Sequence, residues 1–195
     1  MKNKKWMPIL LSMSVLSSMG ISYAAQAEAP TGEQEQKNDQ TSEITGTETS
    51  GIDLSSFEIV DLNGDTVTQD IFKDYDITMI NIWATWCGPC RSELPEIQAA
   101  YEKLPENANI ISICHDAADD TEIANAIVEK MGMEFAVLVP NEELDQSVFT
   151  YLTAFPTTVF VDKEGHMVGD AVIGVPAADD VTQAYLDYID AALER

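Results

Sequence analysis

Apolar residues are spaced in two distinct ways along the chain after residue 50. The runs 77–84 (ITMINIWA), 109–114 (NIISIC) and 157–161 (TTVFV) are almost continuously apolar, which is typical of strands buried on both faces of a sheet. Residues 119–131 and 181–192 instead place apolar side chains every three or four positions, which indicates helices with one buried stripe. Strands and helices therefore alternate along this part of the chain.

Turn-forming residues complete this pattern. Asn63-Gly64 separates two short β-prone runs and predicts a tight hairpin, because both residues tolerate positive φ. Residues 90–104 have a helical pattern that Pro95 is expected to interrupt. The remaining predicted elements are hairpin strands at 57–60 and 66–68, a strand at 135–139, a short helix at 144–152, a strand at 167–173 pairing antiparallel with 157–161, and a last helix opened by Pro176.

The order of these elements predicts an α/β fold. Strands that alternate with helices imply parallel βαβ units, with a central sheet covered on both faces. The late pair of strands adds antiparallel members, so the sheet is expected to be mixed. We therefore expect one domain over residues 51–195, with a central mixed sheet flanked by helices and an added N-terminal β-hairpin.

The first fifty residues carry targeting and spacing signals. Residues 1–27 have a basic head with three lysines, an apolar segment and an Ala-Gln-Ala sequence, which together predict a cleaved signal peptide. The alternative is an uncleaved membrane anchor through residues 6–25. Residues 28–50 are acidic and nearly devoid of large apolar side chains, so we expect a flexible acidic linker. Both alternatives predict an extracytoplasmic location.

Composition excludes several classes of protein. The 195 residues include 34 acidic and 10 basic side chains, for a net charge of -24, which argues against nucleic acid as a partner. A hydrophobic content of 45% argues against a wholly disordered chain. Three cysteines are too few for a disulfide scaffold, and their odd number leaves one thiol to explain.

The densest chemical signal is Trp86-Cys87-Gly88-Pro89-Cys90, which follows a predicted strand and opens a predicted helix. At a helix start, unpaired N–H groups and the helix dipole favour a thiolate on Cys87. Cys90 falls inside the first turn and is expected to be more shielded. This asymmetry predicts one attacking and one resolving sulfur.

The cysteine and histidine positions allow other interpretations. A zinc site would need Cys114, His115 or His166, but Cys114 and His115 are adjacent on a strand and point to opposite faces, so no metal is expected. An inert structural disulfide is a further alternative for the pair. Cys114 is either a buried core thiol or a third redox thiol at the sheet edge.

The histidines and the aspartates after Cys114 do not indicate a functional site. His115 and His166 are expected on the surface. Asp116, Asp119 and Asp120 lack the spacing of a calcium-binding loop, so they are expected to cap a helix.

Several of these segments together resemble a known family. The run 81–95 (NIWATWCGPCRSELP), the DLNGDTV hairpin, the signal sequence and 155–162 (FPTTVFVD) followed by Gly165 are similar to the TlpA/ResA-like branch of the thioredoxin superfamily. The resemblance covers roughly residues 54–193 in order. It implies a thioredoxin-like fold and a thiol-disulfide oxidoreductase.

The resemblance also implies roles for particular residues. Cys87 would be the nucleophile and Cys90 the resolving thiol, while Glu93 would help proton transfer near them. Asn81 stands where cytoplasmic thioredoxins carry a buried Asp, which shifts that burden to Glu93. Substrate-binding roles would fall on Trp86, Gly88, Pro89, Phe155 and a cis-proline at Pro156, whereas Trp83 is expected in the core.

The expected activity is reduction of disulfides in an exported client protein, through a mixed disulfide on Cys87 that Cys90 resolves. The Cys87–Cys90 pair itself would carry the electrons, so no cofactor is expected. Gly-Pro between the cysteines is the thioredoxin dipeptide, which favours reduction over oxidation. Re-reduction implies a membrane electron donor of the DsbD/CcdA kind. The alternatives are a peroxiredoxin-type thiol peroxidase, with one peroxidatic Cys in another local pattern, and a non-catalytic redox-sensing or binding module.

Overall fold

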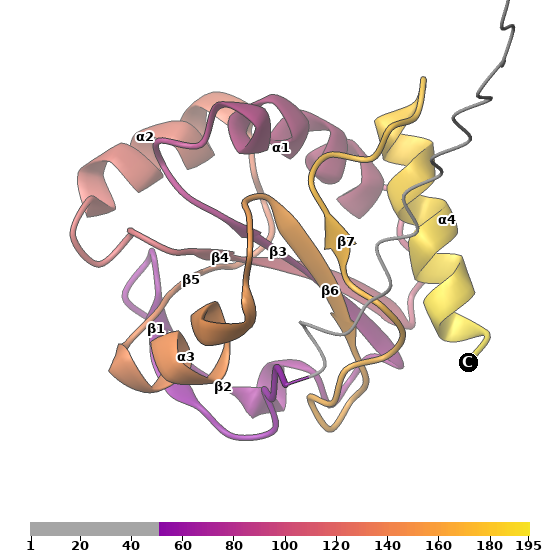
Figure 1. Ribbon diagram of the computed structural model, residues 1–195, viewed down its shortest axis with the longest axis horizontal. Helices are drawn as coiled ribbons and strands as arrows, with labels where there is room; N and C mark the ends of the chain where they lie inside the picture. Colours follow the sequence, from indigo (N-terminus) through magenta and orange to yellow (C-terminus); the bar gives the residue numbers. More distant parts are fainter. Residues whose placement is uncertain (1–50) are drawn as a thin grey trace, which may run out of the picture. The chain divides into compact units, whose positions relative to one another are not determined.

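A mixed sheet forms the centre of the computed structural model, which describes residues 51–195 (Figure 1). The predicted signal peptide (1–27) and linker (28–50) lie outside the described residues. Within 51–195, no helix is both long and apolar enough to cross a membrane. The strands are β1 Glu58–Asp61, β2 Thr66–Thr68, β3 Ile77–Trp83, β4 Ala108–Cys114, β5 Val137–Val139, β6 Thr157–Val161 and β7 Val172–Ile173.

The sheet has the strand order β2-β1-β5-β4-β3-β6-β7. β3, β4 and β5 are parallel, whereas β6 pairs antiparallel with β3, and β7 with β6. The amino-terminal hairpin joins the sheet through antiparallel pairing of β1 with β5. The mixed α/β sheet with an added hairpin is therefore confirmed, and the apolar runs lie in its central strands because both faces of those strands are covered.

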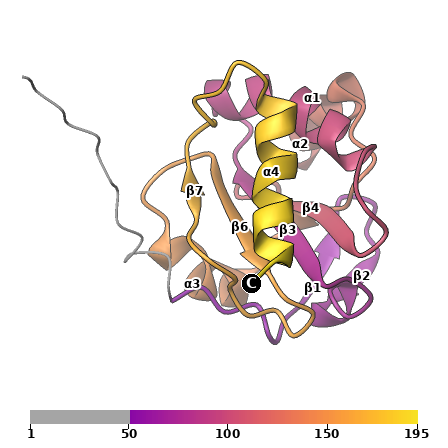
Figure 2. The same cartoon turned by 90° about the vertical axis from the view of Figure 1, so that its right-hand side faces the viewer.

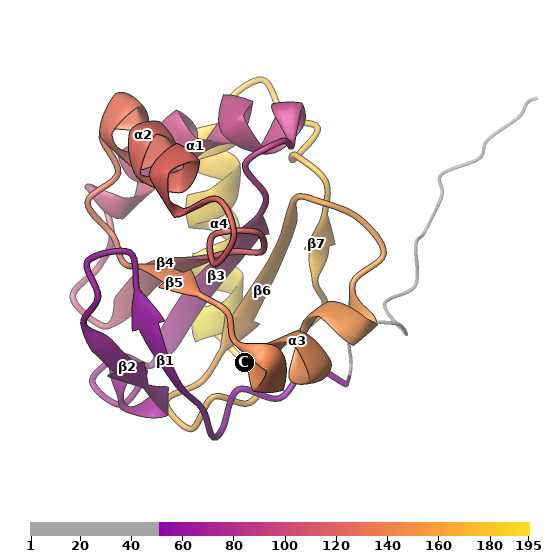
Figure 3. The ribbon, with the colours of Figure 1, turned by 90° about the vertical axis from the view of Figure 1, so that its left-hand side faces the viewer.

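Helices cover the two faces unequally (Figures 2 and 3). The helical elements are α1 Gly88–Tyr101, α2 Thr121–Met131, α3 Glu142–Ser147, α4 Val181–Leu193 and the short 3-10 helices η1 Gln69–Ile71 and η2 Phe149–Tyr151. One core cluster contains side chains of α1, α2 and α4, and we call this side of the sheet the α1 face. The other contains side chains of α3 and of the segment before β1, and we call it the α3 face.

The central strands alternate strictly between these faces. On β3, Met79 and Trp83 pack on the α1 face, while Ile80 and Ile82 pack on the α3 face. The indole N–H of Trp83 donates to the Ser112 hydroxyl of β4 over 3.2 Å, and the side chain is fully buried, so the prediction of a core tryptophan is confirmed. The same parity places Asn81 on the α1 face, beneath α1.

The hairpin forms as predicted, with an additional contribution from Asp61. Gly64 has φ of 85°, the conformation that favours glycine. The Asp61 carboxylate accepts hydrogen bonds from the backbone N–H groups of Asn63, at 2.8 Å, and Asp65, at 3.0 Å. This aspartate therefore satisfies the turn from the end of β1.

Several predicted boundaries are corrected by the structure, among them the short helix at 144–152, which is α3 followed by η2. α1 starts at Gly88 instead of residue 90, and it continues through Pro95, which does not end it. α4 starts at Val181, five residues after Pro176, because the Asp180 side chain accepts from the Gln183 N–H and caps the helix there. The predicted strand 167–173 is reduced to β7 plus one bridge at Met167, because Gly169 between them has φ of 74°.

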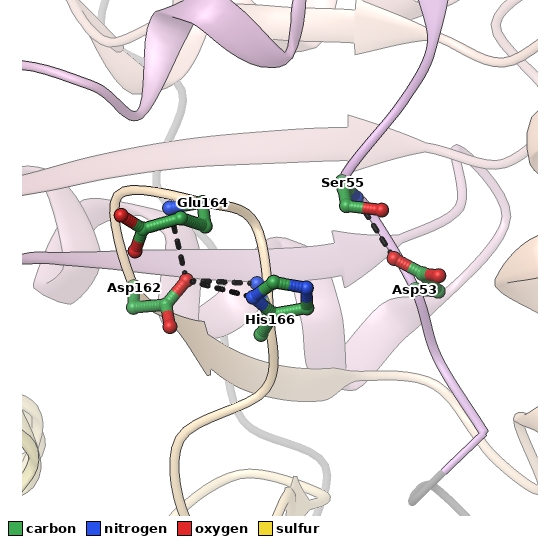
Figure 4. A network of polar contacts seen from close by, with 5 residues as sticks. All are labelled: Asp53, Ser55, Asp162, Glu164 and His166. Carbon is green, nitrogen blue, oxygen red and sulfur yellow. Dashed lines mark hydrogen bonds and ion pairs between the residues drawn. The ribbon is translucent and has the colours of Figure 1, made fainter.

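A small polar network holds the turn after β6 (Figure 4). The Asp162 carboxylate accepts from the backbone N–H groups of Glu164 and His166, at 3.0 and 2.9 Å. The His166 ring is exposed, as predicted, and lies 3.7 Å from the same carboxylate. A bridge from His166 to Asp53 then joins this turn to the segment that enters the domain.

Candidate active site

Cys87 and Cys90 form a disulfide at the start of α1. Cys87 is the N-cap residue, and its sulfur accepts a hydrogen bond from the Cys90 N–H over 3.2 Å. Cys87 retains 4% of its surface exposed and Cys90 none. The sulfur nearer to solvent is thus also the one that the helix start stabilises when negatively charged.

The residues between the cysteines explain why α1 begins here. Cys87 is extended, with φ of -76° and ψ of 104°, and Gly88 is the first helical residue. Pro89 occupies the first turn, where a missing N–H costs no helical hydrogen bond. Gly88 and Pro89 are both exposed, so they lie on the accessible side of the disulfide.

The loop before β6 meets the cysteine loop through aromatic contact. The Phe155–Pro156 peptide bond is cis, as the resemblance implied. The rings of Phe155 and Trp86 are in edge contact, with centroids 5.8 Å apart. Trp86 is 66% exposed, an unusual position for so large an apolar side chain. The structure therefore brings together the aromatic residues predicted to bind substrate.

A buried carboxyl lies one turn after Cys90 along α1. Glu93 is only 1% exposed, so it is not a solvated helix carboxylate. The Asn81 amide donates to its Oε1 over 2.9 Å, and the Tyr185 hydroxyl donates to its Oε2 over 2.7 Å. Burial raises the pKa of Glu93 to about 7, against the lowering effect of the hydrogen bonds from Tyr185 and Asn81.

Tyr185 was missed as a site residue. It belongs to the apolar stripe of α4, and burial together with the neighbouring Glu93 raises its pKa well above the usual range, so its hydroxyl stays a donor. The Asn81 amide also donates to the Thr158 hydroxyl of β6 over 3.2 Å. The signal available in the sequence was a phenol within a stripe expected to be buried, since a buried hydroxyl needs a partner.

An aromatic groove of about 370 Å³ opens beside the disulfide. The predicted surface position of His115 is wrong, because the residue is half-buried. The centroid of its ring lies 4.4 Å from the ring centroid of Phe149 and 5.3 Å from that of Phe155. This follows from η2, which carries Phe149 over the end of β4. The residues lining the groove are Trp86, His115, Phe149, Leu152, Thr153, Ala154 and Phe155.

Cys114 is the buried core thiol that the sequence offered as one of two predictions, whereas the aspartates are arranged differently from the prediction. Cys114 is a free, fully buried thiol on the α1 face, opposite to the side on which His115 lies. Asp120 occupies the N-cap position of α2 without a capping side-chain bond, and Asp116 bonds to Thr85 instead of capping a helix. Within residues 51–195, no group of three or more His, Cys, Asp or Glu side chains is placed to hold a metal ion.

The arrangement is similar to known proteins. The model of the AhpC/TSA family matches residues 51–169. Thiol-disulfide oxidoreductase ResA of Bacillus thuringiensis (strain Al Hakam) is 29% identical over 141 residues, which are 71% of this chain and 78% of that protein. Thioredoxin-like protein YneN of Bacillus subtilis is 24% identical over 136 residues, 68% of this chain and 76% of the relative.

Solved structures agree on the fold. The crystal structure of a thiol:disulfide interchange protein of the thioredoxin family from Chlorobium tepidum superposes with a TM-score of 0.61 at 22% identity. The superposition covers 73% of this chain and 97% of that one. It therefore includes nearly the whole of the Chlorobium domain.

Proposed function

The chain belongs to the AhpC/TSA family and is a thioredoxin-like thiol-disulfide oxidoreductase, and from this premise we propose that it reduces disulfides of exported client proteins. The observation that carries the proposal is the asymmetric pair at the start of α1. Cys87 is the N-cap residue of α1 and follows the exposed Trp86. Cys90 lies inside the first turn of α1 and is fully buried.

The exchange proceeds in two displacements. In the reduced protein the Cys87 thiolate attacks one sulfur of the client disulfide, forming a mixed disulfide and releasing the other client sulfur as a thiolate. The Cys90 sulfur then attacks Sγ of Cys87, which forms the Cys87–Cys90 disulfide and releases the first client sulfur. Two electrons pass to the client, whose disulfide becomes two thiols.

The second displacement requires removal of the Cys90 proton. Glu93 follows Cys90 by three residues on α1, so the two side chains lie on neighbouring positions of one helix face. A carboxyl with a pKa of about 7 is partly ionised near neutral pH and can both accept and return a proton there. Glu93 is therefore proposed as the general base for resolution by Cys90.

The direction and location of the reaction are part of the same proposal. The Gly88-Pro89 dipeptide is that of thioredoxin, whose potential of about -270 mV is far more reducing than that of DsbA at about -120 mV. The segment 1–27 has the composition of a signal sequence, so the domain would act outside the cytoplasm. A membrane donor of the DsbD/CcdA kind would return the two electrons to the pair, and an apocytochrome c is one candidate client.

The proposal is tested by reduction of insulin disulfides with dithiothreitol as electron source. We expect turnover by the wild type and none by Cys87→Ala, and a reducing potential when the pair is equilibrated with glutathione. Cys90→Ser should accumulate a mixed disulfide, whose client half can be identified by mass spectrometry. Absence of turnover by the wild type would overturn the reductase assignment, and rapid consumption of hydrogen peroxide would favour the peroxidase alternative.

A further inference from the structure

Asp116 joins the end of β4 to the loop that carries the cysteines. Its Oδ1 accepts the backbone N–H of Thr85 over 2.9 Å, and its Oδ2 accepts the Thr85 hydroxyl over 2.5 Å. Both oxygens of the Asp116 carboxylate therefore bind Thr85, which lies two positions before Cys87. We infer that Asp116 is a positioning residue for the redox pair, an inference that rests on the proposed exchange at Cys87 and Cys90.

The position of Thr85 determines where the reactive groups lie. The Cys87 N–H donates to the carbonyl of Ala84 over 3.0 Å, so residues 84–87 form one tight turn between β3 and α1. Thr85 is buried inside this turn, while its neighbour Trp86 points outward. Two hydrogen bonds to Thr85 fix both the backbone and the side chain at the centre of the turn, and with them the starting point of α1.

Asp116 can act in this way because its own backbone is anchored. β3 and β4 pair in register up to Trp83 and Cys114, and the His115 N–H extends the pairing by donating to the Trp83 carbonyl over 2.8 Å. The chain then turns, with the Asp120 N–H donating to the Asp116 carbonyl over 2.9 Å. The Asp116 carboxylate is thus held at the end of β4 and reaches the loop between β3 and α1, which makes no strand pairing itself.

The third cysteine has a place in this arrangement. The Cys114 thiol lies 3.4 Å from Oδ1 of Asp116 and donates to it. Burial, together with the negative charge of Asp116, raises the pKa of the Cys114 thiol far above its usual range. Cys114 is therefore kept as a protonated donor that orients Asp116, in contrast to the pair that exchanges electrons.

The ionised state of Asp116 is consistent with the same contacts. Partial burial opposes ionisation, but the hydrogen bonds from the Thr85 hydroxyl and N–H outweigh it and lower the pKa of Asp116. The carboxylate is consequently charged at neutral pH and accepts both bonds. An asparagine at this position would still accept the Thr85 N–H through its Oδ1, which allows geometry to be separated from charge.

The test compares Asp116→Ala with Asp116→Asn in the reduced protein. We expect Asp116→Ala to lower kcat/KM for insulin reduction by about 10- to 100-fold, because small displacements of reacting groups have effects of this size. Asp116→Asn should recover a substantial part of the loss, and Thr85→Val, which removes one bond, should fall between Asp116→Asn and Asp116→Ala. Asp119→Ala, an exposed aspartate of the same loop, is the matched control and should match the wild type.

A second readout keeps the inference independent of client turnover. The rate of Cys87 alkylation by iodoacetamide, followed against pH, reports the thiol directly and needs no substrate protein. Equal effects of Asp116→Ala and Asp116→Asn would assign the role to charge and overturn the positioning inference, as would wild-type kinetics for Asp116→Ala. If Asp116→Ala does not fold, Thr85→Val decides: alkylation and kcat/KM both within twofold of the wild type would overturn the inference. Failure of the wild type to reduce insulin would instead overturn the proposed function. The alkylation rates would still show whether Asp116 affects the reactivity of Cys87.

Discussion

The two sides of the disulfide differ in polarity and in exposure to solvent. On the Cys90 side, Glu93 and Tyr185 are almost completely removed from water and joined by a 2.7 Å hydrogen bond. On the Cys87 side, Trp86 is largely exposed and touches Phe155 through an aromatic edge contact. The buried side has fixed donors and acceptors suited to moving a proton, whereas the rings of Trp86 and Phe155 on the other side offer apolar surface to a client.

This difference also predicts where substitutions are costly. A buried polar group that loses its partner destabilises the fold by about 1–3 kcal/mol, because no water replaces the bond. An exposed aromatic ring can be truncated with changes of about 0.5 kcal/mol or less. Substitutions on the buried side should therefore change rate, pH dependence and stability together, while those on the exposed side should change recognition alone.

The largest of these effects is expected for Glu93→Gln. Removal of a general base typically lowers a rate by about 100-fold or more, and the affected step here is resolution by Cys90. In the wild type the rate should rise with pH through about 7, as Glu93 ionises, and the variant should lack that rise. The measurement is single-turnover release of a client from the Cys87 mixed disulfide between pH 5 and 9.

A matched control for this substitution is Glu106→Gln. Glu106 is an exposed carboxylate between α1 and β4, and its loss should leave the pH profile unchanged. An unaltered profile in Glu93→Gln would remove Glu93 from the proton transfer and, with it, the chemical contrast between the two sides.

Glu93 also makes the stability of the fold depend on pH, with a sign opposite to that of most carboxylates. Its pKa in the folded protein, about 7, is raised above the ordinary value of 4.5, so the folded state holds the proton more tightly. The stabilisation is complete below about pH 4.5 and is lost as pH rises through 7, a change of about 3 kcal/mol. Glu93→Gln should lose this dependence.

The measurement is urea unfolding of the oxidised protein at pH 5 and pH 8, because the disulfide then removes the cysteines from the titration. The difference between the two pH values should be smaller in Glu93→Gln than in the wild type by about 2.5 kcal/mol, because at pH 5 the stabilisation is not yet complete. Equal differences in the two proteins would show that Glu93 is ionised throughout this range. That result would weaken the assignment of a raised pKa to the buried side.

The sequence predicted the exposed side of the site better than the buried side. The CGPC motif, Trp86 and the FP pair are local in sequence, and their resemblance to a family identified them directly. Tyr185 lies 92 residues from Glu93, and the regular stripe of α4 predicts a buried phenol without indicating which group its hydroxyl bonds to. The buried network depends on how α1, α4 and the sheet meet, which no local pattern contains.

The same distinction explains the outcomes for the fold. β3 and β4 were predictable because a strand covered on both faces must be apolar throughout its length. The side chain of His115 was placed wrongly because its environment depends on η2, whose position over β4 is set by tertiary packing. The shortening of β7 likewise depends on the positive φ of Gly169, a conformation that the residue type permits but does not require.

The smallest effect is expected on the exposed side, for Trp86→Ala. An aromatic contact contributes about 0.5–1.5 kcal/mol, so loss of the ring should raise KM for a protein client about three- to tenfold, with kcat nearly unchanged. Reduction of a small disulfide that does not reach Trp86 should be unaffected. Stability should change by no more than about 0.5 kcal/mol, because the ring is already 66% exposed.

Ile123→Ala, which truncates another exposed apolar side chain on α2, is the control and should leave KM unaltered. A fall in kcat without a change in KM would place Trp86 with the chemistry of the buried side, and the division of labour across the disulfide would then be wrong.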